Sequence, residues 1–411
     1  MSDTKSRTRF DWSVLGVLAG VNPWTGALLA LAQRIEFGQL SLVLPDGTNR
    51  VFTGNRHLDV RAVLNIRRPD AVRKVLLGGT TGFGEAYING DWDTPDLYSL
   101  LKLALVNEPI LGSQVQGVGA VMWLERLRHR LRANTQRGSQ RNIAFHYDLG
   151  NDFYELWLDP GMTYSSALFN APEQSLEDAQ NAKCRQLAEL LDLQPGHEVL
   201  EIGCGWGGFA AMAARDYGCR VTAITLSREQ QDYARKRLHE AGLADRVDVR
   251  LQDYRDVKET YDRIASIEML EAVGEEYWST YFDVLRDRMT PSGVAGVQVI
   301  TIEDSRFEQY RHGTDFIQRH IFPGGMLPSP TILSRHIEEA GLKLTDEILF
   351  GESYAETLGI WQRRFQHSWP QVGDLGFDDR FKRMWEFYLA YCEAGFRTAS
   401  IDVGQYRIVR A

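Results

Sequence analysis

Short apolar runs alternate with longer amphipathic segments along the second half of the chain, from Val199 onward. Such runs predict strands, and the segments between them predict helices, one of them with Ser227 as its N-cap. The predicted strands are Val199–Ile202, Arg220–Ile224, Val247–Leu251, Arg263–Ile267 and Val294–Ile302, and the predicted helices are Trp206–Asp216, Ser227–Glu240 and Glu275–Met289. This alternation predicts an α/β fold with a mainly parallel sheet covered by helices on both faces.

The first third of the chain has a different pattern. Apolar residues alternate along 38–44, and Pro45-Asp46-Gly47 then turns the chain into 50–53, which predicts a hairpin. A further strand near 62–66, a glycine-punctuated mixed region over 78–92 and a helix near 97–105 follow. We therefore expect a smaller mixed α+β domain over residues 1–125, an Arg-rich linker over 126–141 and the α/β domain over 142–411.

The C-terminal part of the chain and an uncharged stretch near its start lie outside these two patterns. Residues 303–365 are predicted to be an insertion or cap on the α/β domain, and Arg380–Thr398 a late helix. Near the start, Val14–Ala32 carries no charge, but Asn22-Pro23 and three glycines interrupt it. We expect helices packed on protein or lying at a bilayer surface there, rather than a transmembrane helix or a signal peptide.

Composition and charge limit the kinds of molecule that the chain is expected to bind. The net charge is -9 and the sequence pI about 5.6, which argues against nucleic acid because phosphate binding needs a basic surface. Six arginines without an acid lie between Arg126 and Arg141; this is either a patch for anionic lipid headgroups or a solvated linker face. The four cysteines and nine histidines are scattered, so we expect no metal site and a reducing cytoplasm.

Closely spaced glycines directly follow the first strand of the α/β domain. Gly203, Gly205 and Gly208 let a backbone turn approach a bound nucleotide, either a nicotinamide dinucleotide or S-adenosylmethionine. A dehydrogenase would place an acid after the next strand, where this chain has Thr225-Leu226-Ser227. Glu201 and Asp253 instead suit the ammonium and ribose of adenosylmethionine, unless they are merely solvated strand ends.

Several longer motifs occur in a fixed order from His146 onward. They are His146–Tyr154, Leu158–Ala167, Gly203–Gly208, Thr225–Gln231, Gln252–Asp256, Glu268–Gly274, Arg319–Gly325 and Phe387–Arg397. With these motifs the chain resembles the cyclopropane-fatty-acyl-phospholipid synthases and mycolic acid cyclopropane synthases. The resemblance implies a class I, Rossmann-like S-adenosylmethionine-dependent methyltransferase domain, with a smaller N-terminal domain that engages lipid and a cap over the acyl chain.

The resemblance also implies site residues. For cofactor binding it points to Tyr147, Tyr164, Ser165, Gly203, Gly205, Thr225, Leu226, Gln230 and Tyr254, to which the charge argument adds Glu201 and Asp253. In the resembled family the general base is a bound bicarbonate, held by Cys, Glu, His and Tyr side chains. Glu271 and Tyr354 match two of these positions, whereas Ser166 stands at the cysteine position and Gln298 at the histidine position. Cys392 matches a cysteine considered as a nucleophile, or belongs to the core.

The resemblance finally implies a substrate and a location. The expected reaction is C-methyl or methylene transfer to the cis double bond of an unsaturated phospholipid acyl chain, with bicarbonate as a second cofactor. Ser166 and Gln298 leave three outcomes open: a cyclopropane, a methylene- or methyl-branched chain, or a degenerate lipid-binding protein. The expected partners are a membrane phospholipid, an anionic membrane surface on the cytoplasmic side, and a second copy of the chain in a homodimer.

Overall fold

The computed structural model describes residues 23–115 and 149–411 and forms two compact units, Met1–Trp123 and Leu124–Ala411. The first unit consists of α1 (Pro23–Ala32), β1 (Phe37–Val43), β2 (Asn49–Thr53), β3 (Arg56–Ile66), α2 (Asp70–Ile88), β4 (Trp92–Asp93) and α3 (Leu97–Val115). Its sheet has the order β2-β1-β3-β4, in which β1 and β2 form the predicted hairpin and β1 and β3 run parallel.

The glycine-punctuated region 78–92 contains the end of α2, a turn and the start of β4. α2 is interrupted at Gly79, whose φ of 54° and ψ of -140° are not helical. Glycine adopts this conformation without the steric cost that a side chain would add, so the helix continues after the break.

No helix in the described ranges combines the length and hydropathy of a membrane span. The uncharged stretch Val14–Ala32 ends in α1, a helix of 10 residues. The first part of that stretch, like the Arg-rich linker 126–141, lies outside the described residues.

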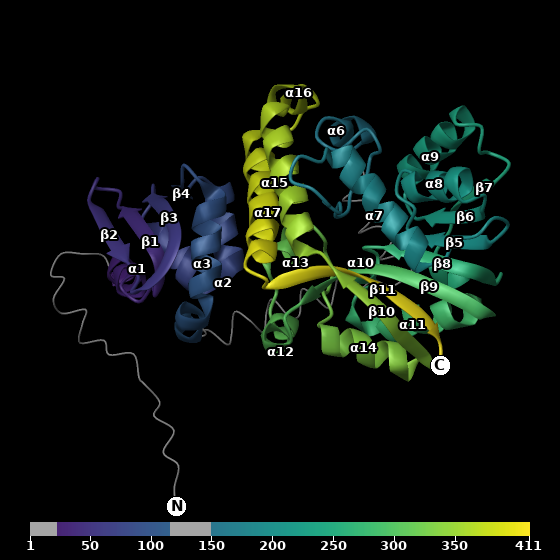
Figure 1. Cartoon of the computed structure of the whole chain (residues 1–411). Helices are drawn as coiled ribbons and strands as arrows, with labels where there is room; N and C mark the ends of the chain where they lie inside the picture. Colours follow the sequence, from purple (N-terminus) through teal and green to yellow (C-terminus); the bar gives the residue numbers. More distant parts are fainter. Residues whose placement is uncertain (1–22, 116–148) are drawn as a thin grey trace, which may run out of the picture. The chain divides into compact units, whose positions relative to one another are not determined.

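The second unit contains the larger sheet and most of the helices (Figure 1). Up to the middle of this sheet the order is α6 (Asn151–Glu155), α7 (Leu176–Leu190), β5 (Glu198–Ile202), α8 (Gly208–Asp216), β6 (Arg220–Thr225), α9 (Arg228–Glu240), β7 (Val247–Leu251), η2 (Tyr254–Asp256) and β8 (Tyr261–Ile267). Then follow α10 (Leu270–Val273), η3 (Glu275–Tyr277), α11 (Trp278–Arg288), β9 (Met289–Ile302), α12 (Asp304–His312), α13 (Phe316–His320), α14 (Pro330–Glu339), β10 (Leu342–Leu349), α15 (Gly351–His367), α16 (Trp369–Asp374), α17 (Asp379–Arg397) and β11 (Ile401–Arg410).

The seven strands of this sheet have the order β10-β11-β9-β8-β5-β6-β7. β9, β8, β5, β6 and β7 run parallel to one another, whereas β10 and β11 are antiparallel additions. Successive residues of a strand face opposite sides, so Val199 joins a core with α7, α8 and α9, and Leu200 joins a second core with α11 and α14. The predicted α/β architecture is thereby confirmed.

Two expectations for the C-terminal part need correction. Residues 303–365 do not form only a cap, because β10 within them is an edge strand of the main sheet. The strand β11 was not predicted, although it inserts between β9 and β10 and brings Gln405 opposite Gln298. The predicted late helix is α17, which lies beside α15 (Figure 1).

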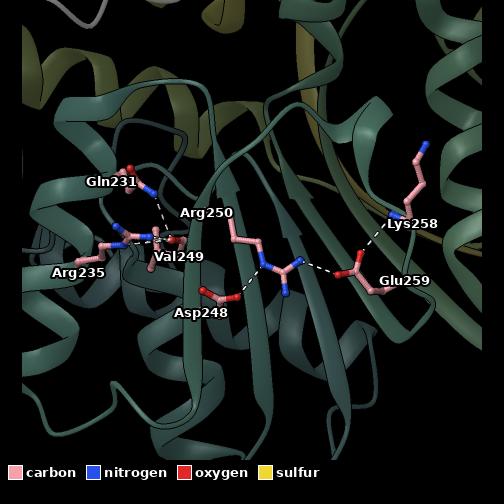
Figure 2. Close-up of polar contacts among 7 residues, drawn as sticks. All are labelled: Gln231, Arg235, Asp248, Val249, Arg250, Lys258 and Glu259. Carbon is pink, nitrogen blue, oxygen red and sulfur yellow. Dashed lines mark hydrogen bonds and ion pairs between the residues drawn. The ribbon is translucent and has the colours of Figure 1, made fainter.

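The opposite edge of the sheet is covered by side chains. The outward carbonyl of Val249 in β7 accepts hydrogen bonds from Arg235, with Nη2 at 2.7 Å, and from Gln231 Nε2 at 3.2 Å (Figure 2). Arg250 in the same strand pairs with Asp248 and Glu259. These contacts occupy a carbonyl that a further strand would use, which protects the edge from pairing.

Asn107 gives a test of how the first unit is held together. It is fully buried in α3, and its Oδ1 accepts hydrogen bonds from the backbone N–H groups of Glu36 at 2.8 Å and Phe37 at 3.1 Å. Asn107→Ala leaves these buried donors without an acceptor, so we expect a local loss of about 2 kcal/mol, or roughly 30-fold faster amide exchange in β1. Hydrogen–deuterium exchange of the full chain measures this; the exposed Asn49→Ala in β2 is the control and should leave β1 protection unchanged.

Candidate active site

The glycine turn after β5 has the backbone that its sequence suggested. Gly203, Gly205 and Gly207 all have positive φ, at 79°, 50° and 81°, before α8 begins at Gly208. A Cβ on Gly203 would lie 2.3 Å from the Met269 sulfur, whereas one on Gly205 would meet nothing within 4 Å. The turn is therefore packed against the segment after β8 on one side and open on the other, which leaves room for a ligand at Gly205.

The ends of β6 and β7 lie next to this turn in the sheet. Thr225 donates a hydrogen bond to Gln230 Oε1 at 2.8 Å and accepts one from Ser227 N–H, while Ser227 caps α9. Leu226 is half-buried between them. After β7, Asp253 caps η2 and pairs with Arg255 at 2.7 Å. The predicted residues therefore gather at the carboxyl edge of the parallel strands, where ligands bind in such sheets.

Two buried polar atoms at this edge have no partner in the described part of the chain. One is Oε2 of Glu201, the other the hydroxyl of Tyr254. Burial raises the pKa of Glu201 to about 8, against the opposing charge of Lys183, and burial raises the pKa of Tyr254 to about 12. A buried acceptor and a buried donor without partners cost free energy unless a ligand satisfies them. The ammonium and polar groups of S-adenosylmethionine are of the kind that would do so.

A second, half-buried carboxylate lies after β8, at Glu268, which the sequence patterns did not single out. Oε1 of Glu268 accepts hydrogen bonds from Ser166 N–H at 2.9 Å and from Gln298 Nε2 at 2.8 Å. Its Oε2 accepts one from the Tyr354 hydroxyl at 2.7 Å. Three of the residues predicted to hold a bicarbonate thus bind a carboxylate of the chain itself. We call Glu268 with Ser166, Gln298 and Tyr354 the Glu268 cluster.

The backbone at Glu268 is unusual. Its φ of 52° lies in the left-handed region, which a non-glycine residue adopts at a cost. The Glu268 N–H donates to the Gln298 carbonyl at 2.8 Å, so backbone and side chain both bind Gln298. These bonds hold the carboxylate in place.

Glu271 is the neighbouring carboxyl group. Its Oε1 accepts a hydrogen bond from the Ile300 N–H, and its Oε2 is buried without a partner among the described residues. Burial, and next the charge of Glu268, raise the pKa of Glu271 to about 8. Burial also raises the pKa of Glu268, which the three donors oppose. Burial thus favours the protonated form of both carboxyl groups, and three donors oppose this at Glu268, whereas one, the Ile300 N–H, opposes it at Glu271.

The remaining predicted residues are placed as follows. The Tyr164 hydroxyl lies 2.8 Å from that of Tyr388, and Ser165 Oγ accepts a hydrogen bond from Lys183 at 2.7 Å. Cys392 is half-buried in α17, where burial raises the pKa of its thiol. A nucleophilic cysteine needs a lowered thiol pKa, so this environment suits packing. Tyr147 lies outside the described residues.

The site contains aromatic side chains from distant segments. Tyr164 contacts Trp361 and Trp157, with ring centroids 5.3 Å and 5.6 Å away. The Tyr354 ring stacks on Phe396 at 4.5 Å. Tyr354, Trp157 and Trp361 are buried, so large aromatic side chains surround the Tyr354 end of the Glu268 cluster.

Glu268 and Lys183 are the residues that sequence reasoning missed. A signal for Glu268 was present, because the motif Glu268-Met269-Leu270-Glu271 places two carboxyl groups three residues apart at the end of a strand. Lys183 gave no comparable signal, since a single lysine in an amphipathic helix usually faces solvent.

Comparisons with known proteins agree with this geometry. The sequence model of the family described as mycolic acid cyclopropane synthetase matches residues 134–406. Tuberculostearic acid methyltransferase UfaA1 of Mycobacterium tuberculosis is 40% identical over 408 residues, covering 94% of this chain and 93% of that protein. The cyclopropane-fatty-acyl-phospholipid synthase of Escherichia coli K12 is 36% identical over 352 residues, covering 84% and 87%.

Solved structures support the same assignment. Mycolic acid cyclopropane synthase CmaA1, crystallised with SAH and CTAB, matches with a TM-score of 0.61 at 31% identity, covering 66% of this chain and 97% of that one. The resemblance stated from the motifs is confirmed, and the nicotinamide alternative is excluded. The chain therefore belongs to the mycolic acid cyclopropane synthetase family, and its second unit is a class I methyltransferase that uses S-adenosylmethionine.

Proposed function

We propose that the protein transfers a methyl group from S-adenosylmethionine to the cis double bond of an unsaturated phospholipid acyl chain, with Glu268 as the general base. The observation that carries this proposal is the Glu268 cluster: a half-buried carboxylate, held by three donors, beside aromatic side chains. The names of the relatives, which include a cyclopropane-fatty-acyl-phospholipid synthase and a tuberculostearic acid methyltransferase, support a fatty acyl substrate.

The cofactor supplies an electrophilic methyl group. We assign its binding to the glycine turn, with Gly203 and Gly205 giving close backbone approach and Glu201 accepting from the ammonium. Thr225, Leu226, Gln230, Asp253 and Tyr254 border the nucleoside part, and Tyr164 and Ser165 the reacting end. Tyr147 belongs to the same proposed set. Each of the described residues lies at or beside the carboxyl edge of the sheet, apart from the loop that carries Tyr164 and Ser165.

The chemistry requires a dry site and a base. When an alkene carbon forms a bond to the methyl group, the methyl–sulfur bond breaks and its electron pair stays on the sulfur of the departing S-adenosylhomocysteine. The neighbouring alkene carbon becomes a carbocation, which water would capture. Buried Trp157, Trp361 and Tyr354 exclude water from this space. The cation then loses one proton to Glu268, and the C–H electron pair forms either the third bond of a cyclopropane ring or, after a hydride shift, a methylene double bond. Either product is neutral.

Glu268 makes a bound bicarbonate unnecessary in this proposal. Ser166 N–H, Gln298 and Tyr354 would otherwise hold the anion, but their hydrogen bonds go to the Glu268 carboxylate. Gln298 fits this role because its amide donates to Glu268 while its Oε1 accepts from Gln405 at 3.0 Å. Glu271 and Cys392 are then not the base: Glu271 is held by a single donor, the Ile300 N–H, and burial raises the pKa of the Cys392 thiol.

One observation favours a methylene-branched product over the ring. The relative that covers 94% of this chain at 40% identity is named a tuberculostearic acid methyltransferase, a name that states methyl transfer. We therefore propose the branched chain as the product.

We also propose that the first unit and the Arg-rich segment 126–141 bring the protein to the cytoplasmic face of an anionic membrane. We propose in addition that the protein acts as a homodimer.

Product analysis tests the reaction. Incubating the full-length protein with methyl-labelled S-adenosylmethionine and vesicles of cis-unsaturated phospholipid should place the label in a branched acyl chain. Mass spectrometry and proton NMR distinguish a methylene signal from a cyclopropane signal. Saturated phospholipid vesicles are the control and should take up no label. Absence of label from both lipids would contradict the proposed function, and a cyclopropane would contradict only the proposed product.

Gly203→Ala tests the cofactor site. The change forces a side chain into left-handed backbone and toward the Met269 sulfur, so we expect the affinity for S-adenosylhomocysteine to fall at least about tenfold. Gly242→Ala is the matched control, because Gly242 has a φ of 67° but its added Cβ would meet nothing within 4 Å. Calorimetric titration should show unchanged affinity for that control. An equal loss of S-adenosylhomocysteine affinity in both variants would mean that backbone strain alone causes the loss, rather than the contact of the new Cβ with Met269.

Glu268→Gln and Glu271→Gln distinguish the two carboxyl groups. Glu268→Gln removes the base, so turnover should fall by about 10²- to 10⁴-fold while S-adenosylhomocysteine affinity stays. Glu271→Gln resembles the neutral form that the raised pKa of Glu271 favours, so its turnover should stay within about tenfold of the parent. The exposed Glu338→Gln controls for the amide substitution itself.

A third variant tests whether the carboxylate itself is needed. Glu268→Gly relieves the left-handed strain and leaves the donors of Ser166, Gln298 and Tyr354 unoccupied. Added formate should then restore part of the turnover, and should not do so in Glu271→Gln. An unchanged rate in Glu268→Gln would remove Glu268 from the mechanism.

A further inference from the structure

Lys183 is a lysine in the interior of the catalytic unit. It lies in α7, is 1% exposed, and is among the largest fully buried side chains of the described residues. An ammonium has three donors, and its Nζ donates one hydrogen bond, to Ser165 Oγ at 2.7 Å. Burying such a group costs several kcal/mol unless other charges compensate it. This unfavourable burial indicates that Lys183 has a role that an apolar side chain could not fill.

Hydrogen bonds from α7 position the loop that contains Ser165 and Ser166. Lys183 binds the hydroxyl of Ser165, and Gln180, one turn earlier in α7, donates to the Ser165 carbonyl at 2.8 Å. The next residue, Ser166, gives its N–H to Glu268. α7 thus holds the short loop that supplies one of the three donors of the Glu268 cluster.

A second link runs through the backbone of the same lysine. The Lys183 carbonyl accepts a hydrogen bond from Gln405 Nε2 at 3.0 Å, and the same Gln405 amide group donates to Gln298 Oε1. Gln298 in turn donates to Glu268. Two of the donors around Glu268 are therefore positioned by bonds that start at Lys183.

The third link is electrostatic. Lys183 forms no ion pair among the described residues, but its positive charge acts on three carboxyl groups: the buried Asp159 in the loop after α6 and Glu201 in β5, and the half-buried Glu268. Burial raises the pKa of each of them, and the charge of Lys183 opposes that rise in every case. The other titratable groups that face Glu268 are Tyr354 from α15 and Glu271 from α10, and neither is a cation.

We propose that Lys183 is a positioning residue for the methyl transfer: its ammonium, bonded to Ser165, holds the loop that gives the Ser166 N–H to Glu268 and favours the ionised carboxylate, while the backbone carbonyl at position 183 holds Gln405. This inference rests on the proposed role of Glu268. The sign follows from the charge. Without the cation the carboxylate is less stable, the proton is held more tightly, and the ionised base is available only at higher pH.

The test uses the full-length protein with four single substitutions, three at Lys183 and one control. Lys183→Met removes the charge and the donor, and Lys183→Gln removes the charge but keeps a donor for Ser165. In both, the acid limb of the turnover–pH profile should move upward by about one pH unit. Lys183→Arg keeps the charge and should restore the parent profile. Lys236→Met, an exposed lysine of α9, is the control and should not move it.

A second measurement does not depend on turnover. Infrared titration of the cofactor-free protein follows the protonated carboxyl band, and subtraction of the Glu268→Gln spectrum assigns the Glu268 part. That part should appear at higher pH in Lys183→Gln than in the parent. Lower turnover with an unmoved profile and an unmoved Glu268 band would overturn the proposal and leave Lys183 as a packing residue.

The two readouts also separate this proposal from the function. If Lys183→Met does not fold, Lys183→Gln decides by the same criteria. If the parent protein methylates no lipid, the proposed function fails, and the infrared titration alone decides whether Lys183 keeps Glu268 ionised.

Discussion

The hydrogen bonds to the Glu268 carboxylate are the constraint on which the arrangement of the catalytic unit depends. A carboxylate taken out of water needs donors on both oxygens, or it becomes protonated. Here the donors come from segments far apart in the chain: Ser166 before α7, Gln298 in β9 and Tyr354 in α15. One half-buried charge thereby fixes how a loop, the sheet and a C-terminal helix meet.

The antiparallel strand β11 helps to orient one of these donors, Gln298. β11 returns along β9 with Gln405 opposite Gln298, and the Gln405 amide bonds the Gln298 oxygen and the Lys183 carbonyl. Gln298 can then present its N–H group to Glu268, because its oxygen is already satisfied. A strand that lies outside the parallel part of the sheet thus sets the orientation of a side chain at the site.

The sequence predicted those features that depend on local rules. Closely spaced glycines after an apolar run, Ser227 at a helix start and the turn at Pro45-Asp46-Gly47 each have a short-range cause, and the structure agrees with them. Glu268 and Lys183 differ, since their roles arise from partners 102 and 18 residues away in the chain. Burial of a charged side chain is visible only when its distant partners are known, so β11 and its Gln405 were missed together with them.

The departures from the family pattern follow from the same carboxylate. A bicarbonate ion has its own hydroxyl donor as well as acceptors, and it can exchange with solvent. The Glu268 side chain is covalently attached, and in its ionised form it can accept hydrogen bonds but not donate them. A serine at position 166, whose hydroxyl bonds the Ala167 carbonyl at 2.9 Å, leaves its N–H for the carboxylate. A neutral glutamine at position 298 donates a hydrogen bond to the carboxylate and carries no titratable proton of its own. Ser166 and Gln298, which weaken a bicarbonate site, are thus the residues that a built-in carboxylate needs.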